Sequence, residues 1–125
     1  MKVFAICPVR NADPELTAAI GKEIADLEAA GYEVHWPPRD TPQDDPIGTS
    51  ICACNRDALL AADFVAVWYD PTSQGSLFDL GIAWGAGKRV VLLNEVTPTE
   101  CKSFANVLLN WNNAAQPPLF TEAGA

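Results

Sequence analysis

The stretch FVAVWYDPTSQGSLFDLGIAWGAGKRVVLL, residues 64–93, decides the expected fold of this 125-residue chain. It predicts a buried strand over Phe64–Trp68, a helix from about Ser76 to Gly85, and a second buried strand over Arg89–Leu93. The strands are apolar at consecutive positions, which is typical of strands that are covered on both faces. Two such strands joined by a helix predict a parallel pair.

The rest of the chain repeats this alternation of strand and helix. Further strands are predicted over Lys2–Ile6 and Tyr32–Trp36, and further helices from Pro14 to about Gly31, over Ser50–Ala62 and after Thr99 or Ser103. The first of these helices has strong boundary signals, because Asp13 can cap it, Pro14 suits its first position and Gly31 suits its end. Residues 37–48, PPRDTPQDDPIG, show no periodicity and predict a long loop.

This pattern predicts an α/β protein, a three-layer α-β-α sandwich around a four- to five-stranded parallel sheet of the Rossmann or flavodoxin type. We expect residues 1–115 to form a single domain and residues 116–125 to form a C-terminal tail.

The composition excludes several classes of function. A net charge of −8 argues against binding to nucleic acid or to an anionic membrane, because both need a basic surface. No apolar run approaches the roughly 20 residues of a membrane helix, and the N-terminus leads directly into a strand, so we expect a cytoplasmic location. The four cysteines and the single histidine lack the spacing of a metal site, so we expect free thiols and no metal.

The candidate site follows from the expected topology. Ligands of parallel α/β sheets bind outside the carboxyl ends of the strands. Four segments lie there and hold much of the polar and proline-rich sequence, namely Cys7–Asn11, residues 37–48, Tyr69–Gly75 and the chain from Asn94 onward. We therefore expect the site to lie among them.

The loop over residues 71–76 is suited to a polar ligand, because it has hydroxyls, an amide and a glycine but no large apolar residue. Asp79 follows in the first turn of the predicted helix, among apolar neighbours. It is either a charge stabilised by the helix N-terminus or a catalytic group with a tuned pKa.

The stretch GSLFDLGIAWGAGKRVVLL, from Gly75 to Leu93, resembles the nucleoside 2-deoxyribosyltransferase superfamily. In that family a glycine-rich loop leads into a helix reading acidic residue-Leu-Gly-x-Ala, then a Gly-Lys turn and an apolar strand. Three other stretches resemble the family in the same order, KVFAICPVR, GYEVHWPPRD and NRDALLAADFVAVWYD, so the resemblance covers most of residues 1–110. It implies cleavage of the N-glycosidic bond of a nucleoside or nucleoside 5′-monophosphate, by hydrolysis or deoxyribosyl transfer, without a cofactor.

The resemblance also implies roles for catalytic residues. Asp79 stands at the position of the carboxylate that attacks C1′ of the sugar, where the family usually has glutamate. Asn55 stands where the family has an aspartate, and with Asp70 it would orient the sugar and the base. From the residues alone, Asp70 either caps its loop or helps to protonate the departing base.

Substrate contacts are implied in the same way. Ser73 and Arg10 align with a serine and an arginine of the nucleoside 5′-monophosphate N-glycosidases. Together with Gly75 and Ser76 they would hold a phosphate at a helix N-terminus. Cys7 and Pro8 in the first loop and Arg39 in the proline-rich loop complete the predicted contacts, and Ser103 and Asn106 would reach a neighbouring subunit's site in a homodimer or higher homo-oligomer.

Each of these residues has a purely structural alternative. Arg10 could pair with Asp13 or Glu15 on the surface, and Ser73 and Ser76 could be ordinary turn and capping residues. Arg39 and Asp40 either close over a ligand or form a surface ion pair, and His35 is expected to be a strand residue rather than an acid. Four aromatic residues could stack on a base or belong to the core: Trp36, Tyr69, Phe78 and Trp84.

Two functions from different classes follow. The first is an N-glycosidase or deoxyribosyltransferase-like enzyme. The second is a nucleotide- or nucleotide-sugar-binding module that keeps the site without turnover, and it is motivated by the aspartate and asparagine that replace the family's glutamate and aspartate.

Overall fold

The computed structural model of the chain describes residues 1–113, so the predicted tail over residues 116–125 lies outside the described part. The elements are, in order, β1 (Lys2–Ile6), α1 (Pro14–Ala29), β2 (Glu33–His35), α2 (Pro37–Asp40), α3 (Thr49–Ala61), β3 (Phe64–Val67), α4 (Gln74–Gly85), β4 (Arg89–Leu92) and α5 (Phe104–Asn113). No helix within residues 1–113 is long and apolar enough to cross a membrane.

The four strands form one parallel sheet in the order β2-β1-β3-β4. In its register Val3 lies opposite Val34 on one side and Phe64 on the other. The central strands β1 and β3 are buried along nearly their whole length, which explains why their sequences do not alternate. The prediction of a parallel α/β fold is confirmed.

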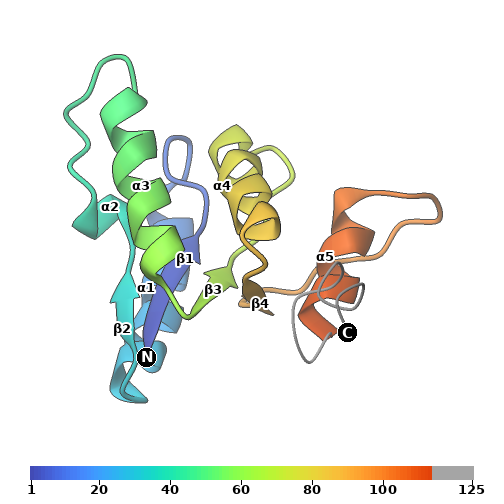
Figure 1. Cartoon of the computed structure of the whole chain (residues 1–125). Helices are drawn as coiled ribbons and strands as arrows, with labels where there is room; N and C mark the ends of the chain where they lie inside the picture. The colour runs from blue at the N-terminus through green and yellow to red at the C-terminus, as the bar shows by residue number, and fades with distance from the viewer. Residues whose placement is uncertain (114–125) are drawn as a thin grey trace.

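Helices cover both faces of this sheet, as Figure 1 shows with α3 and α4 in front of the strands and α1 behind them. On the first face Leu59, Leu80 and Leu108 from α3, α4 and α5 pack against the sheet. On the other face Ile20 and Ile24 of α1 do so. The two separate clusters of buried side chains are the two cores of the predicted three-layer sandwich.

The predicted boundaries of α1 are confirmed in detail. The Asp13 side chain accepts a hydrogen bond from the Leu16 N–H at 2.7 Å, and Pro14 is the first helical residue. Gly31, with φ of 100°, follows the C-cap Ala30 in the left-handed conformation that glycine adopts most readily.

Two sequence predictions about elements are wrong in part. Residues 37–48 do not form a loop throughout, because Pro37 and Pro38 start the single turn of α2, and proline is tolerated at the beginning of a helix. Helix α4 begins at Gln74 rather than near Ser76, because Ser73 is its N-cap. Asp79 is therefore the sixth residue of α4, in the second turn and not in the first.

Candidate active site at the carboxyl edge of the sheet

The topology places a switch point between β1 and β3. The chain leaves β1 toward β2 on one side, and β3 and β4 lie on the other side of β1. The loops that follow β1 and β3 therefore diverge at the carboxyl edge of the sheet, where ligands of such folds bind. Cys7 and Pro8 lie in the first of these loops, and Asp70 and Ser73 in the second.

Asp79 is the group at this edge with the most unusual environment. Its carboxylate is half-buried and forms no hydrogen bond or ion pair with any group within residues 1–113. Burial raises its pKa from the ordinary 3.8 to about 6. Because a carboxylate stabilised by a helix N-terminus has a lowered pKa, this shift favours the interpretation of Asp79 as a group with a tuned pKa.

Cys7 lies near Asp79 and is a buried neutral thiol. Burial is the main reason why its pKa is raised to about 11, the nearby Trp36 side chain opposes the shift, and the Asp79 charge adds to it. The contact with Trp36 is weak, because the buried indole Nε1 meets no acceptor at good hydrogen-bond geometry within the described chain. Cys7 and Pro8 are both buried, so they shape the wall beside Asp79, and a thiol of this pKa is not a nucleophile at neutral pH.

Arg10 is exposed in the loop after β1. The alternative surface pairing with Asp13 or Glu15 does not form, because none of the four ion pairs among the described residues includes Arg10 and because the Asp13 carboxylate caps α1. The guanidinium is therefore available to an anion.

Ser73 and Ser76 begin α4. The Ser73 Oγ accepts a hydrogen bond from the Ser76 N–H at 3.3 Å, and the two hydroxyls lie 2.9 Å apart. Ser76 is buried, whereas Gly75 between them is exposed, and a Cβ atom at this position would meet no atom within 4 Å. The structural role as a cap is confirmed for Ser73, and the space above Gly75 is open.

Asp70 holds the shape of the same loop. Its Oδ1 accepts hydrogen bonds from the Thr72 N–H at 2.9 Å and the Thr72 hydroxyl at 2.7 Å. Asp70 therefore caps its own loop, which is the structural one of the two roles considered for it. Its second carboxylate oxygen has no protein partner among residues 1–113.

Asn55 belongs to a buried polar network that the sequence does not reveal. The Thr41 hydroxyl donates to the Asn55 Oδ1 at 2.6 Å, and the His35 Nε2 lies 2.7 Å from the same hydroxyl. His35 ends β2, Thr41 follows α2 and Asn55 lies on α3, so the network joins three elements. No sequence motif predicts this network. Thr41 lies within residues 37–48, which the sequence predicts to be a loop, and the path of a loop does not follow from its sequence.

Arg39 forms hydrogen bonds with protein groups at the β2 edge of the sheet. Its guanidinium donates to Glu28, Asp40 and the Val34 carbonyl, all at 2.9–3.2 Å, and it lies over the Trp36 ring. The surface ion pair between Arg39 and Asp40 is therefore formed, and the guanidinium is occupied by protein groups.

Ser103 and Asn106 stabilise the loop that leads into α5. The Asn106 amide bonds to the backbone of Thr99 and Cys101, and the Ser103 Oγ accepts from the Thr99 hydroxyl and the Asn106 N–H. Ser103 also borders a cavity of about 490 Å³ beyond the carboxyl ends of β3 and β4, next to Tyr69 and Leu77.

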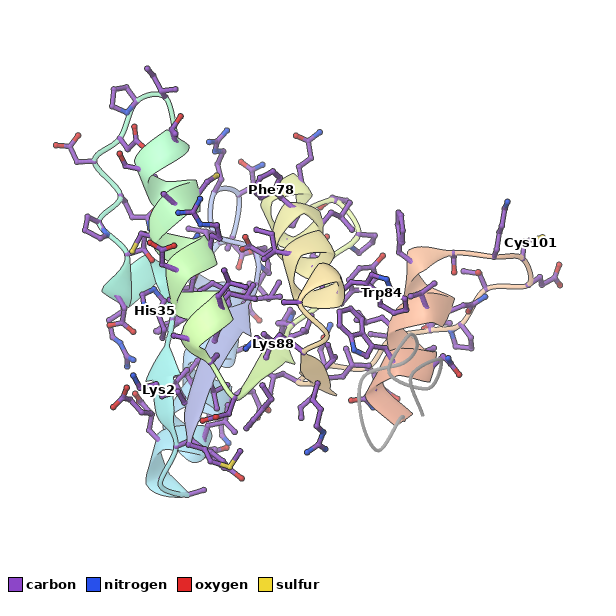
Figure 2. The ribbon with its side chains drawn as sticks, viewed as in Figure 1. Lys2, His35, Phe78, Trp84, Lys88 and Cys101 are labelled. Atoms are coloured by element: carbon purple, nitrogen blue, oxygen red, sulfur yellow. The ribbon has the colours of Figure 1, made fainter. Side chains whose placement is uncertain are left out.

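The aromatic residues differ in their surroundings. Figure 2 labels Phe78 and Trp84 on α4; both are exposed, at 58% and 41%. Trp84 also meets Trp111 of α5 edge-to-face, with ring centroids 5.0 Å apart. Trp36 and Tyr69 are half-buried against the two cores.

Only some of the site residues predicted from the sequence therefore lie close together in the structure. Asp79 lies near Cys7, and the residues that start α4 form one cluster around the Ser73 cap. Arg39 is tied to the β2 edge, and Ser103 and Asn106 belong to the loop before α5.

No family model matches the sequence, and no curated protein matches it either. Solved structures do match the fold. A 2-deoxyribosyltransferase from Bacillus psychrosaccharolyticus superposes with a TM-score of 0.65 at 17% identity, over 91% of this chain and 92% of that one. The CMP N-glycosidase of Clostridium botulinum superposes with a TM-score of 0.55 at 24% identity, over 74% of this chain and 70% of that one.

A conserved protein from Enterococcus faecalis V583 gives a TM-score of 0.60 at 21% identity, over 92% of this chain and 76% of that one. At these identities the likeness establishes a shared fold. The chain has the fold of the 2-deoxyribosyltransferase-like proteins, which is the fold that the motif resemblance predicts.

Proposed function

We propose that this protein cleaves the N-glycosidic bond of a nucleoside or nucleoside 5′-monophosphate, with Asp79 as the nucleophile. The observation that carries the proposal is the half-buried Asp79 carboxylate, which has a pKa of about 6 and no partner within residues 1–113. Its position at the carboxyl edge of a fold shared with a 2-deoxyribosyltransferase and a CMP N-glycosidase supports a role in nucleoside chemistry.

The chemistry follows that of a retaining glycosidase. The ionised Asp79 attacks C1′ as the bond to the base breaks, and the base leaves with the bonding electron pair and takes up a proton. Water, or a second base in a transferase, then attacks C1′ and releases the Asp79 carboxylate. A carboxylate that has lost part of its hydration shell and has no hydrogen bond to a protein group is a stronger nucleophile for this step.

Arg10 and the start of α4 are the groups that we assign to a 5′-phosphate. Arg10 carries a guanidinium that forms no ion pair within the described residues, and the open backbone at Gly75 lies at the N-terminal end of a 12-residue helix. In a chain with a net charge of −8, a local cation of this kind is needed to attract a phosphate. We assign Asn55 and Asp70 to positioning of the substrate. Asp70 would act through the carboxylate oxygen that does not bind Thr72.

The deciding assay incubates the protein with a panel of nucleosides and 5′-monophosphates and measures free base by chromatography. We expect base release by the wild type and loss of release in Asp79→Asn. Asp57→Asn is the matched control, because Asp57 is an exposed aspartate on α3 that pairs only with its neighbour Arg56 in the described part of the chain.

A ligand that raises the melting temperature of both wild type and Asp79→Asn but is recovered intact would contradict cleavage, and it would identify a binding module instead. Absence of both release and stabilisation across the panel would contradict the proposal altogether.

We also propose that the protein is a homodimer or larger homo-oligomer. Four large apolar side chains on α4 and α5 are exposed in the single chain, Phe78, Trp84, Phe104 and Val107. An association through these helices would cover them. Sedimentation of the wild type and of Phe78→Ser tests this: we expect an oligomer that the substitution weakens, and a wild type that sediments as a monomer would contradict it.

A further inference from the structure

A cavity of about 260 Å³ lies between α3 and the strands β1 and β2, at the β2 edge of the sheet. It is bordered by Lys2, Val3, Glu33, Val34, His35, Arg39, Asp40, Ala58, Ala61 and Ala62. Of the predicted catalytic and substrate-binding residues, only Arg39 borders it. Figure 2 shows two of its residues, Lys2 and His35, on the β1–β2 side of the molecule, away from Phe78 and Trp84.

The cavity exists because the sequence places charged and small residues where a core would need large apolar ones. The register pairs Lys2 with Glu33 and Phe4 with His35, and Phe4 belongs to the core on the α3 side. Lys2, Glu33 and His35 therefore face α3. Helix α3 and its C-cap meet them with alanines at positions 58, 61 and 62, whose side chains are too short to fill the space.

Two opposite charges in this cavity have no partner within the described residues. Arg39 is already paired with Asp40 and Glu28, at 2.9 and 3.0 Å from its Nη2 atom. Lys2 and Glu33 lie opposite each other in the register, but neither side chain forms an ion pair within residues 1–113. The cavity thus offers one ammonium and one carboxylate to a ligand.

His35 adds an acceptor. Because the Thr41 hydroxyl donates its proton to Asn55, it accepts from His35, which assigns the ring proton to Nε2. The Nδ1 atom is then left with a lone pair and no partner in the described chain. Glu33 and His35 are two residues apart on the same face of β2, roughly 7 Å along the strand.

We propose that this cavity binds a small zwitterion of the class of a free α-amino acid. Its carboxylate would pair with Lys2, and its ammonium would donate to Glu33 and to the His35 Nδ1. A ligand with only negative charge would face Glu33 and Asp40, and one with only positive charge would face Lys2 and Arg39. The volume lies below the ~300–1,000 Å³ of sites for drug-sized ligands, which fits a ligand of this size.

The test titrates the full-length protein with each of the protein amino acids and follows the ring signals of His35 by NMR. His35 is the only histidine of the chain, so its signals are unambiguous. We expect at least one amino acid to shift them saturably, and its deaminated acid and decarboxylated amine to bind at least about tenfold more weakly.

Variants test whether the ligand binds in this cavity. Lys2→Met and Glu33→Gln should each weaken binding by about tenfold or more, whereas Lys22→Met, on the exposed surface of α1, should leave it unchanged. Ala58→Leu should abolish binding by filling the cavity. If Ala58→Leu does not fold, Lys2→Met and Glu33→Gln still decide, because both residues are exposed.

The proposal is overturned if no amino acid shifts the His35 signals up to about 10 mM, if an analogue with one charge binds as tightly, or if Lys2→Met and Glu33→Gln bind like the wild type. Asp79→Asn should bind the amino acid normally, so the result is independent of the proposed glycosidic activity.

Discussion

Asp79 illustrates how burial sets the chemistry of one residue. Burial removes water from the carboxylate, and no described group compensates with a hydrogen bond, so the protonated form is favoured up to a pH of about 6. The same aspartate on an exposed helix would be a fully ionised surface charge. Its functional interpretation therefore depends on its environment, which the sequence indicates only through the surrounding apolar residues.

The pH dependence of activity follows from this pKa. The attacking form of Asp79 is the ionised one, so we expect kcat/KM to fall as the pH decreases through about 6 and to be level above it. Initial rates of base release measured from about pH 4 to 8 check this. A rate that increases as the pH falls below 6 would show that Asp79 is not the ionised nucleophile.

Stability should change in the opposite sense. The folded-state pKa of Asp79, about 6, lies above the ordinary 3.8, so the folded protein holds the proton more tightly and loses stability as the pH rises from about 4 to about 6. Asp79→Asn removes this loss. The free energy of unfolding of Asp79→Asn minus that of wild type should be larger by about 1 to 3 kcal/mol at pH 7 than at pH 3.5, so the variant gains stability relative to wild type as the pH rises. Urea denaturation of wild type and Asp79→Asn at both pH values measures this change. A stability difference between the two proteins that is the same at both pH values would contradict the burial of the Asp79 charge.

The two arginines show the limit of sequence reasoning about single residues. In the sequence, Arg10 and Arg39 both follow predicted strands in polar segments, and both are predicted as substrate contacts. Arg39 is instead bound by Glu28, eleven residues earlier, and by Asp40, whereas Arg10 remains without an ion pair in the described part of the chain. The difference depends on tertiary contacts with α1, which the local sequence does not contain.

At the scale of elements, capping decides where α4 begins and thereby where Asp79 lies. Two serines three residues apart are both credible caps, and the one that caps, Ser73, lengthens the helix at its N-terminal end. This moves Asp79 away from the positive end of the helix, where its pKa would have been lowered. Similarly, α1 is predictable because Asp13 and Pro14 are adjacent signals, and α2 is not, because a four-residue helix has no periodicity.

The cap also gives a test of α4. Ser73→Ala removes the hydroxyl that accepts from the Ser76 N–H, and we expect a loss of about 1 kcal/mol in the free energy of unfolding. Ser73→Asp restores an acceptor and should recover most of it. Chemical denaturation of both variants measures the effect; equal stability of Ser73→Ala and wild type would mean that Ser73 is not the cap.

At the scale of the whole molecule, the parallel sheet is predictable from its apolar strands, and the boundaries of most elements agree within about two residues. Which groups meet across elements is not predictable. The His35–Thr41–Asn55 network and the cavity under α3 arise from contacts between β2, α2 and α3, and no spacing within the sequence encodes such contacts.

The attachment of α5 is a further property of the whole molecule. Trp111 is buried against α4, and its Nε1 donates to the Lys88 carbonyl at 2.9 Å. Trp111→Ala should therefore cost about 3 to 5 kcal/mol, because it leaves a large space between α4 and β4. Phe104→Ala, at an exposed position of the same helix, should change stability by less than about 0.5 kcal/mol in the dilute single chain. Thermal unfolding compares the two, and a smaller loss for Trp111 than for Phe104 would contradict this packing of α5.

Mass spectrometry of the protein quenched during turnover with a nucleoside 5′-monophosphate tests directly whether Asp79 is the nucleophile. We expect a covalent sugar adduct on the peptide that contains Asp79, and neither adduct nor free base with Asp79→Asn. Release of base at an unchanged rate by Asp79→Asn, with no adduct on that peptide in the wild type, would contradict the assignment of Asp79 as the nucleophile.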